Sequence, residues 1–169
     1  MPDVWKRGTA TGYKPRMASR GLSIWLALLR IAAGVSLFAA GLHKLQWFTH
    51  PPLDQRFLEW SQHPANAMVA RYLHFVSNHP SILSRMVVMG ELGLGALLII
   101  GFLTPLAALL AFFMVLNFQF AGSSMFSLNY ITGQSGLAYL LIYPVLILGR
   151  AGTTLGVDGM LAGGGRRPG

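Results

Sequence analysis

Two charged residues, Arg30 and Glu91, lie in stretches that are otherwise apolar enough to cross a bilayer. A charge at mid-bilayer costs about 2.5–3.5 kcal/mol on insertion scales, so each residue needs a partner. Small residues flank both charges, which allows a neighbouring helix to approach closely and favours the bundle interior. Two interpretations stay open. The charges form either a polar centre for a quinone, a proton or an anionic substrate, or a buried pair that only fixes two helices together.

We predict that Glu91 pairs with Arg30. Counted from the outer ends of their segments, Arg30 lies about 20 Å and Glu91 about 13 Å deep, and an extended arginine side chain spans that difference. Lys44 would have to reach down about 12 Å. We therefore expect Lys44 to extend its ammonium group to the outer interface. With His43 it would form the outer mouth of the polar centre, where a proton could leave.

A second group of candidates lies in the segment FFMVLNFQFAG. Asn117, with Phe113 and Phe120 nearby, could form a flat apolar pocket with an amide donor for a quinone head group. Hydrogen bonding between helices among packing aromatic rings is the alternative, and it is the one we favour.

The sequence offers no metal site. It contains no cysteine, so it has no thiolate nucleophile, disulfide or iron–sulfur ligand of its own. The five histidines have no HxxxH spacing, and surface positions in an interfacial loop explain them better than metal ligation. They are His43, His50, His63, His74 and His79.

The elements that must position these residues are predicted to be helices in a membrane. The chain is 53% hydrophobic and 11% charged, with a mean hydropathy of +0.52, which is too apolar for an ordinary soluble domain. Four segments have the length and apolarity of a spanning helix: 22–42, 86–103, 105–121 and 131–149. Helix signals place Gly101 at the end of the second, Thr104 as the cap of the third, and Pro144 inside the fourth. The fold class is an all-α, four-helix membrane bundle.

The loop between the first two spans carries a helical pattern. Leu53, Phe57 and Trp60 recur at helical spacing, and after Pro64 a second stripe contains Ala65, Met68, Val69, Tyr72 and Val76. We expect two short amphipathic helices on the membrane surface.

Basic residues set the expected topology. Residues 1–20 contain five Lys and Arg, and the tail contains Arg150, Arg166 and Arg167. The positive-inside rule places both termini in the cytoplasm and the 43–85 loop outside a cell membrane. This placement explains the net charge of +8 better than nucleic-acid binding does. We divide the chain into a basic segment 1–20, a membrane domain 21–161 and a disordered tail 162–169.

Three stretches resemble the DoxX family of small membrane proteins, which includes the DoxD subunit of thiosulfate:quinone oxidoreductase. They are LLRIAAGVSLFAAGLHKL, ELGLGALLIIGFLTPLAALLA and LGRAGTTLGVDGML. The resemblance implies a four-helix bundle that works in electron transfer to quinone, as the acceptor, or in thiol redox defence with soluble partners. A second oxidoreductase subunit is expected beside it, and association with a second copy of the chain stays open.

The resemblance leaves alternatives for residues and function. Arg150 and Asp158 would either dock a soluble partner or serve as an anchor and a turn residue, and we favour the latter. A non-catalytic scaffold for redox proteins and a small-solute transporter remain alternatives to the oxidoreductase subunit.

Overall fold

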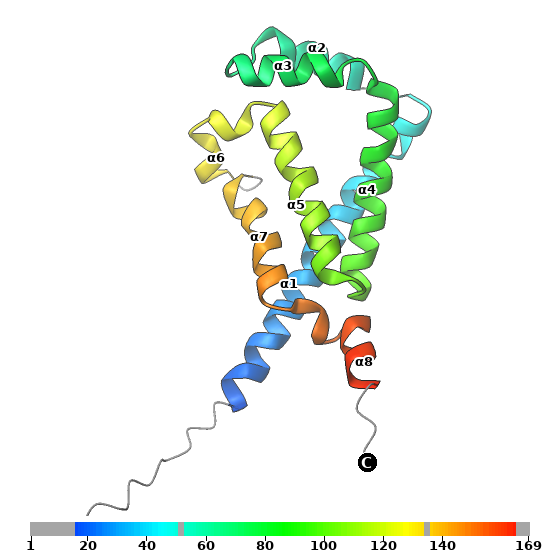
Figure 1. Ribbon diagram of the computed structural model, residues 1–169, viewed down its shortest axis with the longest axis vertical. Coiled ribbons are helices and arrows are strands. Elements are labelled where there is room, and N and C mark those ends of the chain that lie inside the picture. Colours follow the sequence, from blue (N-terminus) through cyan, green and yellow to red (C-terminus); the bar gives the residue numbers. More distant parts are fainter. Residues whose placement is uncertain (1–15, 51–52, 134–135, 165–169) are drawn as a thin grey trace, which may run out of the picture.

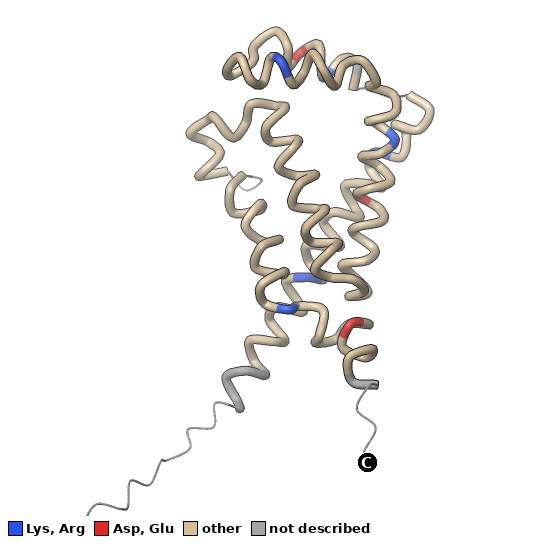
Figure 2. The backbone as a smooth tube through the Cα atoms, in the orientation of Figure 1, with Lys and Arg blue, Asp and Glu red and all other residues tan. Residues whose placement is uncertain are grey.

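A computed structural model describes residues 16–50, 53–133 and 136–164, and every regular element in this part of the chain is helical. The bundle consists of α1 (Arg16–His43), α4 (Pro80–Ile100), α5 (Thr104–Ala121) and α7 (Leu137–Leu148), arranged as Figure 1 shows. The first three are long and apolar enough to cross a membrane, and α7 is a shorter apolar helix. Along the bundle the chain is almost free of charged positions (Figure 2). The predicted all-α membrane fold is confirmed.

Helices α1 and α4 pack along a seam of glycines. A Cβ atom on Gly95 would lie 2.7 Å from the Phe38 nitrogen, and one on Gly34 would lie 2.9 Å from the Gly95 oxygen. Gly41 packs in the same way against Leu92. Because Gly41 is close to the end of α1 whereas Leu92 is far inside α4, α4 extends beyond α1 by about 15 Å. This offset decides which charges meet.

The turn from α4 to α5 is as tight as the sequence predicts. Gly101 ends α4 in the left-handed region at φ 69°, where only glycine avoids strain. Leu103, rather than Thr104, is the cap of α5, with a φ of 49°. The predicted cap is therefore wrong by one residue, because the left-handed turn holds Leu103 just outside the helix.

The fourth predicted span, 131–149, is only partly helical. The short helix α6 (Asn129–Thr132) ends before Gly133, and α7 starts only at Leu137. Gly136 is non-helical, and the Tyr130 carbonyl occupies the place where a side chain on Gly136 would lie. At 1.5 Å per residue α7 is about 18 Å long, well short of a bilayer core. Pro144 lies inside α7, as predicted.

Helices α2 (Leu53–Gln62) and α3 (Ala67–Val76) lie across one end of the bundle, and we call them the lid (Figure 1). They bury Leu53, Phe57, Val69, Leu73 and Val76, together with Trp47 of the 3-10 turn η1 (Leu45–Phe48). Two amphipathic helices were predicted here and are present. In the predicted stripe Met68 is exposed, however, and Leu73 is buried instead.

The opposite end of the bundle carries the start of α1 and the final helix. We call it the terminal end (Figure 1). After α7 the chain forms the turn η3 (Ala151–Thr153) and then α8 (Val157–Gly164). The helix thus includes the first residues of the segment predicted as a disordered tail, 162–169. Residues 165–169, and residues 1–15 of the basic segment 1–20, lie outside the described part.

Candidate functional site

The buried carboxylate of Glu91 forms an ion pair with Lys44. Lys44 follows the last residue of α1, and its backbone nitrogen still donates to the Gly41 carbonyl, so its side chain starts opposite Glu91. The Glu91 side chain is 6% exposed and that of Lys44 is 27% exposed. The ammonium group also lies over the rings of Trp47 and Phe118, 5.4 and 5.7 Å from their centroids. Two aromatic faces and one carboxylate therefore stabilise its charge.

The predicted pairing of Glu91 with Arg30 is wrong, and so is the prediction that Lys44 extends to the interface. The predicted depths of Arg30 and Glu91 require the outer ends of α1 and α4 to lie level, whereas α4 extends well past α1. Glu91 therefore lies level with the end of α1, and Arg30 lies near the far end of α4. His43, the other predicted mouth residue, is exposed as the last residue of α1.

Arg30 holds the terminal end together. Its side chain is fully buried, and Nη1 and Nη2 donate to the carbonyls of Ala151 and Leu155 at 3.0 and 2.7 Å. Gly101 and Gly156 leave the space that the guanidinium fills, since a Cβ on either would collide with it. Arg30 thus fixes α1 to the segment between α7 and α8. This matches the tethering interpretation of its charge, with backbone carbonyls in place of Glu91.

Asp158 completes this arrangement. Its two carboxylate oxygens accept from the backbone nitrogens of Leu103 and Thr104, each at 2.8 Å, and its own nitrogen donates to the Gly101 carbonyl. We call Arg30, Asp158 and the backbone groups that they bind the terminal clasp. Burial acts to raise the pKa of Asp158, but hydrogen bonds from Thr104 and Leu103, and the charge of Arg30, hold it below its ordinary value.

Asp158 and Arg150, the two residues considered for partner docking, differ in whether their side chains are engaged within the chain. Both oxygens of the Asp158 carboxylate are occupied by the start of α5. Arg150 is exposed, with a left-handed φ of 50°, and its carbonyl accepts from Thr153. The helix-capping role of Asp158 was missed, because nothing in GVDGM indicates which distant helix start the carboxylate would meet.

A cavity of about 330 Å³ opens beside the ion pair, and we call it the Glu91 cavity. Helices α1, α4, α5 and α7 contribute to its walls, as does the short turn η2 (Ser124–Phe126). The lining residues are Leu37, Ala40, Lys44, Glu91, Val115, Phe118, Gln119, Ser124 and Tyr139. Within the described part of the chain, Glu91 Oε2 is buried and has no hydrogen-bond partner. A polar ligand donating to that oxygen would satisfy it, which lowers the cost of burying it.

The aromatic and amide residues predicted for a quinone pocket lie elsewhere. Asn117 donates to the Tyr72 hydroxyl of α3, and Phe120 packs edge-on against the same ring. Phe113 is 56% exposed on the outside of the bundle. Their neighbours on α5, Phe118 and Gln119, reach the cavity instead. Their spacing from Val115 puts the three on one helix face, and this is the signal in the sequence that separates them from Asn117.

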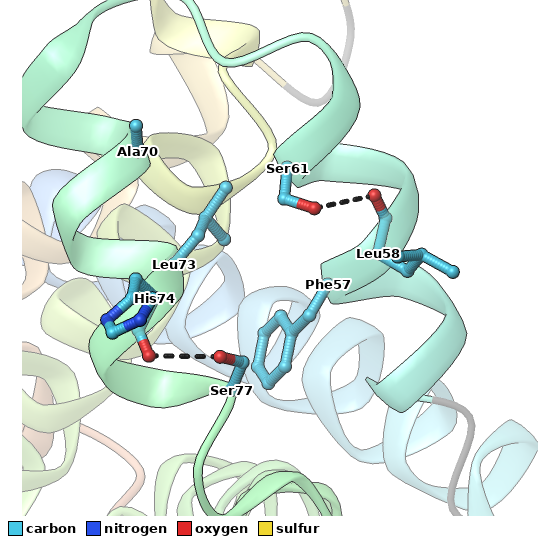
Figure 3. A pocket seen from close by; sticks show the side chains of 7 residues that line it. All are labelled: Phe57, Leu58, Ser61, Ala70, Leu73, His74 and Ser77. Carbon is cyan, nitrogen blue, oxygen red and sulfur yellow. Dashed lines mark hydrogen bonds between the residues drawn. The ribbon is translucent and has the colours of Figure 1, made fainter.

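A larger groove of about 510 Å³ lies in the lid between α2 and α3 (Figure 3). Phe57 and Leu73 form its apolar walls, and His74 lies at its edge. Its two serines are already bonded within their own helices, Ser61 to the Leu58 carbonyl and Ser77 to that of His74. The groove therefore lacks the paired charges that line the Glu91 cavity, which is the stronger candidate site.

The family model of DoxX matches residues 25–124. The matched region runs from α1 to the end of α5 and contains Lys44, Glu91, Phe118 and Gln119, whereas α7 and α8 lie beyond it. No curated protein and no solved structure matches the chain.

Proposed function

The chain belongs to the DoxX family of membrane proteins, and from that premise we propose that it is the quinone-binding membrane subunit of an oxidoreductase. The observation that carries the proposal is the Glu91 cavity, where a charged pair meets an aromatic wall inside the bundle. Ionisable residues inside a membrane domain commonly mark the path of a substrate or a proton.

The cavity residues fit a quinone head group. Phe118, Leu37 and Val115 provide apolar walls for a flat ring. Lys44 offers donors and Glu91 an acceptor, the few polar groups that would orient such a ring. The volume of about 330 Å³ lies at the lower end of ligand pockets, which suits a head group without its isoprenoid tail.

Within this function the chain would handle protons while a partner handles electrons. A bound quinone would accept electrons, and the chain has no cysteine from which a thiol could deliver them. A second subunit or a soluble redox protein would therefore be the electron donor, and thiosulfate is one candidate substrate on that side. Glu91 would hold a proton at its carboxylate beside the ligand, with Lys44 connecting it to the exposed end of α1.

The test is quinone binding to the purified protein in lipid nanodiscs. We expect decylubiquinone or menadione to bind in the micromolar range, and Glu91→Gln and Phe118→Leu to weaken binding at least about tenfold. Phe113→Leu on the outside of the same helix is the matched control and should bind like the wild type.

The absence of quinone binding, or equal affinities in all four proteins, would overturn the proposal. The scaffold alternative would then gain support if proteins that co-purify with the wild type also co-purify with Glu91→Gln.

A further inference from the structure

Two tyrosines on α7 form a hydrogen-bonded pair beside the Glu91 cavity. Tyr139 lines the cavity, whereas Tyr143, one helical turn later, is fully buried. The Tyr143 hydroxyl donates to the Tyr139 hydroxyl at 3.2 Å, and the rings meet nearly at right angles, with centroids 5.8 Å apart. Neither residue was singled out from the sequence, and both lie beyond the matched family region.

The hydrogen bond between the two tyrosines has a defined direction. A phenol carries a single hydrogen, and a fully buried phenol must place it on a protein acceptor. For Tyr143 that acceptor is the oxygen of Tyr139. Tyr139 therefore keeps its own hydrogen, which makes no other bond to the described residues. The hydrogen remains available for a ligand in the cavity.

The cavity then presents a neutral donor from α7 and an acid–base group from α4. We propose that Tyr139 donates a hydrogen bond to a carbonyl oxygen of the ligand ring, and that Tyr143 positions it. This inference rests on the proposed function and narrows its ligand class. The ring must carry an oxygen acceptor on the side of Tyr139 and a second oxygen that exchanges a proton with Glu91. A planar hydrocarbon of equal size lacks both features.

Binding of two matched rings separates this role from simple packing. The probes are menadione and 2-methylnaphthalene, which has the same fused rings without oxygens. In Tyr139→Phe we expect menadione affinity to fall about tenfold and 2-methylnaphthalene affinity to stay unchanged. Tyr143→Phe should lower menadione affinity by a smaller factor, because the Tyr139 hydroxyl remains but loses the hydrogen bond from Tyr143 that positions it. Tyr72→Phe, in the lid, is the control and should match the wild type.

Infrared spectroscopy gives a readout that packing alone would not change. With carbonyl-labelled menadione bound to the wild type, one carbonyl band should lie at the lower frequency of a hydrogen-bonded group, and Tyr139→Phe should remove that shift. Wild-type affinity and an unchanged band in Tyr139→Phe would overturn the inference, as would equal weakening of both rings. If Tyr139→Phe has no effect but Glu91→Gln still weakens menadione binding, the proposed function stands without the inference about Tyr139. Failure of the wild type to bind either menadione or decylubiquinone would overturn both.

Discussion

Arg30 is buried and Lys44 half-buried in the bundle, and these basic side chains have different chemical environments. Arg30 donates to the backbone carbonyls of Ala151 and Leu155, and a planar guanidinium suits two such acceptors at once. Lys44 provides a single charge beside Glu91 and keeps part of its side chain exposed. The first arrangement fixes the fold, and the second places an ion pair at the wall of a cavity.

The pairing of Lys44 with Glu91 can be tested by removing one or both charges. Glu91→Leu or Lys44→Met alone should lower the free energy of unfolding by about 2–3 kcal/mol, less than for a fully buried pair because Lys44 is partly exposed. The double variant should recover most of that loss, because no unpaired charge remains. Thermal melting in detergent, followed by circular dichroism, measures the effect. Recovery in Arg30→Met/Glu91→Leu instead would show that the pairing described here is wrong.

The capping carboxylate of Asp158 makes a pH-dependent contribution to stability. Because its pKa is lowered in the folded protein, it stabilises the fold above its unfolded pKa of about 3.9, and the contribution is lost as the pH falls through the folded value. At pH 7, Asp158→Ala should therefore lower the free energy of unfolding by about 1 kcal/mol, as for other helix caps, and should melt at a lower temperature than the wild type. In acid, the melting temperatures of the variant and the wild type should converge. Glu59→Gln, at an exposed carboxylate of the lid, is the control. A constant difference across the pH range would contradict the capping role.

At the scale of elements, the α1–α4 seam sets the geometry of the site. The glycines of both helices allow backbone contact and fix the offset that brings Lys44 to Glu91. Any side chain that separates the helices would also separate the two charges.

Two glycines on α4 provide a matched pair for testing the seam. A Cβ on Gly95 would meet the backbone of Phe38 and Gly34, whereas a Cβ on Gly93 meets nothing within 4 Å. Gly95→Ala should cost about 1–3 kcal/mol in the free energy of unfolding, because backbone atoms must move. Gly93→Ala should be neutral or slightly stabilising, by up to about 1 kcal/mol. Equal melting temperatures for the two variants would contradict the close packing.

Local signals in the sequence predict most of these elements but not their relative positions. The helical pattern in the lid, Gly101 and the spans around α1, α4 and α5 were all accessible, since each depends on nearby residues. The offset between α1 and α4 was not, because apolar length alone does not reveal where a helix continues beyond the membrane. The same limit explains why Arg30 was matched to Glu91, and why Gly133 and Gly136 were not recognised as the break before α7.

At the scale of the whole molecule, the two ends of the bundle differ in construction. One end is covered by the lid and lies near the Glu91 cavity, and the other is closed by the terminal clasp, with the start of α1 and α8 beside it (Figure 1). The Glu91 cavity, which Lys44 lines at the end of α1 and Gln119 near the end of α5, therefore lies closer to the lid than to the terminal clasp. A proton released from Glu91 by way of Lys44 would leave on the side of the lid.

The positive-inside rule predicts which side of the membrane the lid faces. Because the sequence contains no cysteine, a cysteine introduced at one position provides a single thiol for labelling. We predict that Gln62→Cys, exposed in the lid, reacts with a membrane-impermeant maleimide in intact spheroplasts, because the rule predicts that the lid faces outward. Met160→Cys, exposed on α8, should react only after permeabilisation. The unmodified chain is the control and should give no signal. The reverse pattern would invert the topology and place proton release in the cytoplasm, whereas labelling of both sites in intact cells would contradict their placement at opposite ends.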